Sequence, residues 1–189
     1  MDERTLNAYN QKATTLAQKH QASVPERLYT LAKTFFIKNG ATADIGSGIG
    51  RDTDWLIQNG YPTTGFEPSE GMRRIAREQY PRHSFKEMHL PAIETLENKF
   101  DNIFCSAVLM HIPRAELLSS AMSLLRALKS EGRMLLSFRH GQNENDGRLF
   151  EPYHAGQVAQ LFESLGGKVI LMEEDGVWKN LVIEKGDLS

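Results

Sequence analysis

The stretch Ala41-Thr-Ala-Asp-Ile-Gly-Ser-Gly-Ile-Gly-Arg51, followed by Gly65-Phe-Glu67, decides the fold of this chain. It begins with a short apolar run of the kind that forms a buried β-strand, and three glycines follow at alternate positions. Residues 51–59 then fit an amphipathic helix, with Trp55 and Leu56 among its apolar positions. This order predicts a strand, a glycine turn and a helix whose N-terminus faces the turn.

The glycine turn and the acidic residue that follows the next strand indicate a ligand site. Gly46, Gly48 and Gly50 carry no Cβ, so their backbone can approach a bulky ligand closely. Glu67 ends a second strand-like segment, where a carboxylate can accept hydrogen bonds from both hydroxyls of a ribose. The combination favours a ligand that contains adenosine.

Two departures from the dinucleotide pattern narrow the choice of ligand. A nicotinamide-binding fingerprint counted from Gly46 requires a glycine at position 51, where this chain has Arg51. Asp44 precedes the glycines by two residues, so we expect its negative charge beside the ligand. The sequence therefore favours a cationic ligand over a diphosphate.

The run Asp44-Ile-Gly-Ser-Gly-Ile-Gly50, with Glu67, resembles motif I and the following acidic position of class I S-adenosylmethionine-dependent methyltransferases. The resemblance extends from about residue 41 to the C-terminus. It implies S-adenosylmethionine as cofactor, with the glycine turn against the methionine portion and Glu67 on the ribose diol. A tight turn without a ligand is the alternative. The cofactor-binding residues expected in this region are Asp44, Gly46, Ser47, Gly48, Gly50, Arg51, Glu67 and Pro68.

Two further cofactor contacts are expected from the same resemblance. Tyr9 resembles an N-terminal Tyr that closes over the methionine tail in some relatives, although a helical Tyr also packs into cores. Arg51 or Arg27 would then pair with the carboxylate of that tail.

The region after the third predicted strand departs from the family pattern. Met88 and His89 stand where relatives usually place an Asp that binds the adenine amino group. Met88 would pack against the ring, and a backbone carbonyl or Glu87 would bind the amine. His89 fits a surface residue equally well.

The segment Phe100–Pro113 resembles the motif IV region, where a buried strand opens onto cofactor and acceptor. It lacks the Asn-or-Asp-Pro-Pro-Tyr box and has Ser106-Ala-Val-Leu-Met-His111 instead, as in the small-molecule and miscellaneous branch of the family. Ser106 is an expected cofactor contact. His111 is interpreted either as a catalytic residue beside the methyl-transfer line or as a structural residue that bonds backbone and caps the helix after Pro113.

A second polar cluster follows the fifth strand. Arg139 and His140 are expected where an acceptor arrives, and residues 142–148 are interpreted as a lid or as a solvated loop. His111, His140 and His154 are the candidate general bases, because imidazole is partly neutral near pH 7. No metal is expected, since no His and Cys residues stand at ligand spacing.

Composition restricts the class of protein. A chain of 189 residues, 40% hydrophobic and 24% charged, has the size of one domain, so residues 1–189 are expected to form a single unit. The net charge of -2 makes nucleic acid an unlikely partner. No apolar run approaches the roughly 18 residues that span a bilayer, so no membrane contact is expected. The single Cys105 fits a reducing cytoplasm.

The alternation of short apolar strands and amphipathic helices predicts an α/β fold: a three-layer, doubly wound sheet of seven strands, mainly parallel. A turn at Glu174-Asp175-Gly176 predicts an antiparallel terminal hairpin. The resemblance implies the strand order 3-2-1-4-5-7-6. The predicted strands are 41–46, 62–67, 83–87, 100–106, 131–138, 167–174 and 177–184. The predicted helices are 4–20, 25–38, 51–59, 69–79, 113–129 and 154–165, with a short turn or helix at 91–97.

The functional expectation is a methyltransferase that acts on a small molecule, because the chain has little room for a separate substrate domain. The N-terminal helices within residues 1–40 would form part of the acceptor pocket. Two alternatives stay open: a protein or RNA methyltransferase that works with a partner protein, and a non-catalytic S-adenosylmethionine-binding subunit.

Overall fold

The structure is a computed structural model that describes residues 2–93, 96–139 and 147–186. Its strands form one sheet in the order β3-β2-β1-β4-β5-β7-β6, which confirms the order that the family resemblance implies. The first five strands are parallel, and β7 runs antiparallel to both β5 and β6. The strands are β1 Thr42–Ile45, β2 Thr63–Phe66, β3 Ser84–Lys86, β4 Phe100–Ser106, β5 Leu128–Arg139, β6 Gly167–Asp175 and β7 Trp178–Lys185.

The helices follow the predicted pattern with two corrections. They are α1 Glu3–Gln11, α2 Ala13–Ala22, α3 Glu26–Phe35, α4 Arg51–Gln58, α5 Glu70–Gln79, α6 Leu117–Ala127 and α7 Ala155–Ser164. The single helix predicted for residues 4–20 is wrong: the chain breaks at Lys12, and the break lets both α1 and α2 contact α5. The helix predicted for 113–129 is shorter, because Arg114–Glu116 form a 3₁₀ turn and Leu128 already pairs with Phe100 in the sheet.

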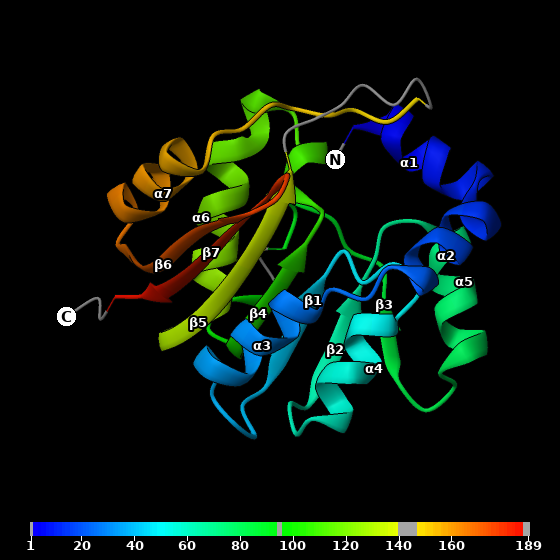
Figure 1. Ribbon diagram of the computed structural model, residues 1–189, viewed down its shortest axis with the longest axis horizontal. Coiled ribbons are helices and arrows are strands. Elements are labelled where there is room, and N and C mark those ends of the chain that lie inside the picture. Colours follow the sequence, from blue (N-terminus) through cyan, green and yellow to red (C-terminus); the bar gives the residue numbers. More distant parts are fainter. Residues whose placement is uncertain (1, 94–95, 140–146, 187–189) are drawn as a thin grey trace.

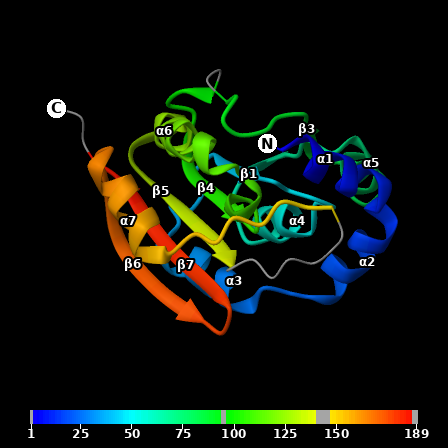
Figure 2. The same ribbon diagram turned by 90° about the horizontal axis from the view of Figure 1, so that it is seen from above.

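Helices cover both faces of the sheet, with α3 and α4 on one side and α6 on the other (Figure 1, Figure 2). Neighbouring strand residues point to opposite faces, so each face has its own core. Ile103 and Cys105 pack in the larger core, which also includes buried residues of α6 and α7. Phe104 packs in the other core with residues of α3 and α4.

The N-terminal helices form a third packed layer at one end of the sheet. Figure 2 shows α1 and α2 beside α5, far from α7. Ala13, Leu16 and Ala17 of α2 bury their side chains against Ile49 of the glycine turn and Met72 of α5. This packing places α2 directly over the turn that the sequence marked as a ligand site.

No helix within the described part of the chain has the length and apolar character that a bilayer crossing requires.

Candidate functional site

A cavity of about 660 Å³ lies at the carboxyl ends of β1, β4 and β5, and residues of α1, α2 and the segment Ser23–Leu28 form another wall. This is the edge where ligands gather in open α/β sheets. The expected site residues that line this cavity are Tyr9, Gly46, Ser47, Gly48, Arg51, Glu67, Ser106 and His111. The expected site residues that do not line it are Asp44, Gly50, Pro68, Met88 and His89. His140 and residues 142–146 of the expected lid or loop lie outside the described residues.

The three glycines of the turn all have positive φ, but they serve different purposes. A Cβ on Gly46 would lie 2.2 Å from Val108 Cγ2, and one on Gly50 would lie 2.5 Å from Phe85 Cζ. These two glycines therefore allow the turn to pack against the protein itself. A Cβ on Gly48 would meet no atom closer than 3.8 Å, so this position opens into the cavity. The expectation that Gly50 contacts a ligand is thus replaced by a packing role.

Glu67 is buried at the end of β2, where backbone N–H groups hold both of its oxygens. Gly48 N donates to Oε2 at 2.9 Å and Ser69 N donates to Oε1 at 2.8 Å. Burial raises the pKa of this carboxyl, and the two backbone hydrogen bonds and Arg73 oppose the rise. An ionised carboxylate offers about four lone-pair positions, so two remain to accept hydrogen bonds from a ligand.

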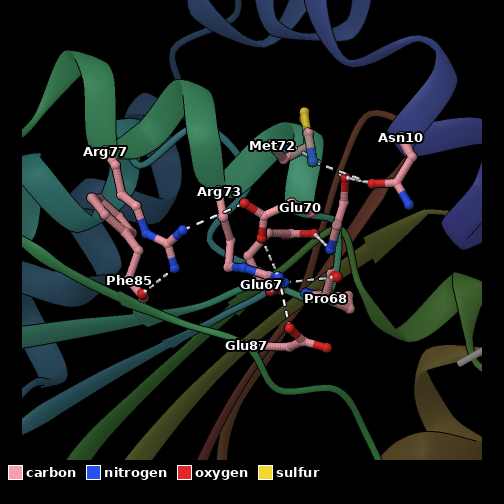
Figure 3. A network of polar contacts seen from close by, with 11 residues as sticks. Asn10, Glu67, Pro68, Glu70, Met72, Arg73, Arg77, Phe85 and Glu87 are labelled. Atoms are coloured by element: carbon pink, nitrogen blue, oxygen red, sulfur yellow. Dashed lines mark hydrogen bonds and ion pairs between the residues drawn. The ribbon is translucent and has the colours of Figure 1, made fainter.

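The buried guanidinium of Arg73 holds the loop that carries Glu67 (Figure 3). Its Nη1 donates to the carbonyl oxygens of Glu67 and Pro68, at 2.5 Å and 2.7 Å. Its Nη2 donates to the carboxylates of Glu70 and Glu87, which are largely exposed. Arg73 thereby ties the end of β2 to α5. Pro68 is expected from the sequence to contact the cofactor. In the structure its carbonyl oxygen accepts a hydrogen bond from Arg73.

Helix α1 is joined to the same loop through Asn10. The Asn10 Oδ1 accepts from Ser69 Oγ at 2.7 Å and from Gly71 N at 3.2 Å. Ser69 is also the N-cap of α5, since its hydroxyl accepts from Met72 N. Asn10 therefore connects the helix that carries Tyr9 to the loop that carries Glu67.

Asp44 is buried behind the turn and does not face the cavity, which corrects the expectation of a negative charge beside the ligand. Thr53 Oγ1 of α4 donates to Asp44 Oδ2 at 2.6 Å. Burial, with the nearby charge of Asp52, raises the pKa of Asp44 to about 8. Burial therefore favours the protonated form of Asp44, which lies at the contact between β1 and α4.

Met88 and His89 do not line the cavity. Met88 is half-buried against the larger core. His89 is exposed, and its Nδ1 lies 3.2 Å from the carbonyl oxygen of Leu90. Glu87, the other residue considered for the adenine amine, pairs with Arg73 instead.

His111 is buried on the cavity wall between Tyr9 and Phe150. Its Nδ1 lies 2.6 Å from the carbonyl oxygen of Leu149, so Nδ1 carries the proton and donates it there. Its Nε2 lies 3.1 Å from the Tyr9 hydroxyl and accepts from it. Of the two interpretations, the backbone contact is present, although its carbonyl belongs to Leu149 and not to the helix after Pro113. His111 also lines the cavity, as the catalytic interpretation requires.

The two arginines considered for a ligand carboxylate already have protein partners. Arg51 forms two hydrogen bonds with Asp52, at 2.8 Å and 2.9 Å, and also donates to the carbonyls of His20 and Ser23. Arg27 forms a two-pronged ion pair with Glu173 of β6. Both arginines therefore join N-terminal segments to the sheet domain. His154, the third candidate base, is exposed and does not line the cavity.

The sequence did not identify several residues that line the cavity. His20 and Met72 lie over Gly48, since each has an atom 3.8 Å from the position of a Gly48 Cβ. Burial, with the charges of Arg51 and Arg148, lowers the pKa of His20, so its imidazole is neutral at pH 7. Trp178 faces Arg139 across the β5–β7 pair. No local signal marks these positions, because a His within a helix and a Trp at a strand start are both common in cores.

Among the described residues, no three His, Cys, Asp or Glu side chains gather in a way that would hold a metal ion.

Comparison with known proteins shows that one segment of the chain matches a known protein family. Residues 43–136 match a family model described as a methyltransferase domain. An uncharacterized methyltransferase from Alkaliphilus oremlandii (strain OhILAs) is 32% identical over 100 residues, which are 53% of this chain and 46% of that protein. The match thus spans less than half the length of this curated relative.

Solved structures show the same fold at low sequence identity. One is a chain of the complex between the Haloferax volcanii Trm112 methyltransferase activator and a methyltransferase, with a TM-score of 0.78, 13% identity, and coverage of 98% of this chain and 97% of that chain. Another is the Burkholderia thailandensis 1,6-didemethyltoxoflavin-N1-methyltransferase with bound 1,6-didemethyltoxoflavin and S-adenosylhomocysteine, with a TM-score of 0.65, 17% identity, and coverage of 79% and 72%.

The matched segment begins within β1 and ends within β5, so it includes the glycine turn, Glu67 and Ser106 on the cavity wall. The segment 43–136 is therefore similar to a methyltransferase domain, and the sheet has the strand order that the resemblance to class I S-adenosylmethionine-dependent methyltransferases implies.

Proposed function

We propose that this chain transfers the methyl group of S-adenosylmethionine to a small-molecule acceptor. The observation that carries the proposal is one continuous cavity. It is lined by the glycine turn with Glu67, by Arg139 at the end of β5 and by Trp178 at the start of β7. Cofactor and acceptor would therefore lie in the same cavity. Its volume falls within the roughly 300–1,000 Å³ of small-ligand sites.

The residues on the cavity wall fit the cofactor. Glu67 has lone pairs left for the two ribose hydroxyls after it accepts from Gly48 and Ser69. Gly48 lines the cavity, and the nearest atoms to a Cβ there, from His20 and Met72, would lie 3.8 Å away without a clash. Met72 and Leu16 provide apolar surface beside this turn. These features match a ligand with a ribose and an apolar thioether portion.

When bound, S-adenosylmethionine supplies a methyl carbon that an acceptor lone pair attacks while the C–S electron pair returns to sulfur. The chain's own contribution is to hold the two reactants in line, which supplies up to roughly 7–11 kcal/mol of the barrier. The α1–α2 layer closes one side of the cavity and excludes water there. We propose this role for the N-terminal helices. We also propose that they form part of the wall of the acceptor pocket.

A base is needed only if the acceptor arrives protonated. We propose His111, acting through Tyr9: the Tyr9 hydroxyl gives its proton to His111 Nε2 while its oxygen takes one from the acceptor. The Leu149 carbonyl holds His111 in the tautomer that this step requires. His140 and His154 are the other sequence candidates, and His20 is a neutral imidazole on the same cavity wall.

A small acceptor is favoured by the charges on the cavity wall. They have both signs, which does not form the basic rim expected for a nucleic-acid substrate. The cations are Lys19, Arg27, Arg51, Arg139 and Arg148, and the acidic groups are Glu26, Asp52, Glu67 and Asp175. The Burkholderia thailandensis structure, which holds a small acceptor, supports this choice.

The alternative is a protein or RNA methyltransferase that works with a partner protein. The likeness to a chain of the complex with the Trm112 methyltransferase activator favours it, since the match covers 98% of this chain. Co-purification with an activator protein that is needed for turnover would select this alternative.

The test replaces Glu67 by Ala and by Gln. Loss of charge-assisted hydrogen bonds worth about 1.5–3 kcal/mol should weaken S-adenosylmethionine binding roughly ten- to a hundredfold in Glu67→Ala, with Glu67→Gln in between. Isothermal titration calorimetry measures this affinity. Glu78→Gln, at an exposed position of α5, serves as the matched control.

Unchanged affinity in Glu67→Ala would contradict the ribose role. Release of S-adenosylhomocysteine during incubation with a panel of small acceptors, followed by mass spectrometry, separates an enzyme from a non-catalytic binder.

A further inference from the structure

We propose that His20 determines how the cavity chooses between S-adenosylmethionine, which carries a positive charge on sulfur, and S-adenosylhomocysteine, which does not. The inference rests on the proposed function, and it adds a residue that controls the choice of ligand at the same site. A neutral imidazole at this position admits the cationic cofactor, whereas a charged side chain there disfavours it.

The packing of α2 places the His20 ring on the glycine turn. Leu16, one helical turn earlier, packs in the same apolar cluster as Ile49 of that turn. Side chains four residues apart lie on the same face of a helix, so His20 faces the turn as well. Its Nδ1 would lie 3.8 Å from a Cβ on Gly48, and the residue lines the cavity.

The backbone at the end of α2 is held by Arg51 of α4. The Arg51 Nη1 donates to the carbonyl oxygens of His20 and Ser23. The same guanidinium forms two hydrogen bonds with Asp52, at 2.8 Å and 2.9 Å. These bonds fix the backbone from which the His20 side chain reaches the cavity wall.

The charged groups that act on the His20 ring come from three segments, and most of them are cations. They are Lys19 of α2, Arg51 and Asp52 of α4, and Arg148 of the segment before α7. Helix α5 places the uncharged Met72 beside the same turn. Burial and the nearby cations lower the pKa of His20, so the ring is neutral at pH 7 and takes up a proton only in more acidic solution.

The two ligands differ by one charge, which isolates the electrostatic effect of His20. They share the adenosine, the amino group and the carboxylate, and the last two groups keep the same charge in both ligands between pH 5 and 7. A proton on His20 repels the sulfonium and has little effect on the neutral thioether. Binding of S-adenosylmethionine should therefore weaken, relative to S-adenosylhomocysteine, as the pH falls from 7 to 5.

The experiment measures the dissociation constants of both ligands for the full chain by isothermal titration calorimetry at pH 7 and pH 5. The quantity of interest is the ratio of the constant for S-adenosylmethionine to that for S-adenosylhomocysteine. Between pH 7 and pH 5 we expect this ratio to rise at least about threefold more in the wild-type chain than in His20→Gln. Any pH dependence from Glu67 and His111, which line the same cavity, remains in His20→Gln and is thereby subtracted.

A permanent charge at the same position tests the inference without any titration. His20→Lys should raise the ratio at least about threefold at pH 7. His89→Lys adds the same charge at an exposed position that does not line the cavity, and it should leave the ratio unchanged. The affinity for S-adenosylhomocysteine shows whether the cavity of each variant is intact, and if His20→Lys does not bind it, the comparison with His20→Gln decides.

An equal rise of the ratio in the wild-type chain and in His20→Gln would overturn the inference while the proposed function stands. An unchanged ratio in a His20→Lys variant that still binds S-adenosylhomocysteine would do the same. If the wild-type chain binds neither ligand, the proposed function fails, and the inference fails with it.

Discussion

At the residue scale, two buried carboxyl groups near the glycine turn differ in what surrounds them. Glu67 accepts from two backbone N–H groups and stands close to Arg73, so its charge is partly compensated. Asp44 accepts from one hydroxyl and lies near the negative charge of Asp52. Burial raises the pKa of both carboxyl groups, and the hydrogen bonds to each group reduce that rise.

Asp44 should make the stability of the protein depend on pH. Its pKa is about 8 in the folded chain and near 3.8 when unfolded, so between these values the folded state holds the proton more firmly. Stability should therefore fall as pH rises across this window, by at most about 1.4 kcal/mol per pH unit from this group. Asp44→Asn should show a smaller decrease.

Urea unfolding of both proteins at pH 5, 6 and 7 measures this difference. Glu67 contributes a slope of the same sign to both, so it cancels in the comparison. Parallel slopes in the two proteins would show that Asp44 ionises normally in the folded state.

At the scale of elements, the α1–α2 layer is attached to the domain at a few defined points. Asn10 binds the N-cap region of α5, and Arg51 of α4 donates to carbonyls at the end of α2. Tyr9 of α1 also binds His111, Thr5 accepts from Leu149 N, and α2 packs on Ile49 and Met72. Because these contacts are separate from one another, loss of one of them should affect local opening of this layer and not the sheet.

Asn10→Ala should loosen this layer without unfolding the sheet. Loss of the hydrogen bonds to Ser69 and Gly71 is worth about 1 kcal/mol net, so amide exchange in residues 3–22 should accelerate roughly fivefold. Hydrogen–deuterium exchange with mass spectrometry measures this, with β4 and β5 as internal reference. Asn7→Ala, at an exposed position of the same helix, is the matched control. Equal acceleration in both variants would mean that the Asn10 contacts do not hold α1.

The ends of helices and strands could be predicted from the sequence where neighbouring residues mark them. The strand 100–106 was predicted at its observed bounds, since an apolar run and its flanking residues mark both ends. The break at Lys12 and the early start of β5 at Leu128 were missed. Both depend on a partner distant in sequence, α5 in one case and Phe100 in the other.

At the scale of the whole molecule, ligand binding should appear as a gain in stability. A ligand present at one hundred times its dissociation constant stabilises the folded chain by about 2.7 kcal/mol. For a chain of this size the melting temperature changes by about 2–4 °C per kcal/mol, so S-adenosylhomocysteine should raise it by roughly 5–10 °C. Differential scanning calorimetry measures the shift. An equal rise with NADH would contradict the preference for an adenosyl thioether over a dinucleotide.

The sequence by itself determined the α/β class, the glycine turn with Glu67, and the terminal hairpin, because each is encoded by neighbouring residues through periodicity, missing side chains and turn preference. Only the tertiary structure decided which of the expected residues share a cavity. It placed Asp44 and Gly50 in packing roles, and it brought Tyr9, His111, Arg139 and Arg148 together from four separate segments. The reason is physical: which side chain faces a cavity depends on how helices and strands far apart in the chain pack, and local sequence does not encode that packing.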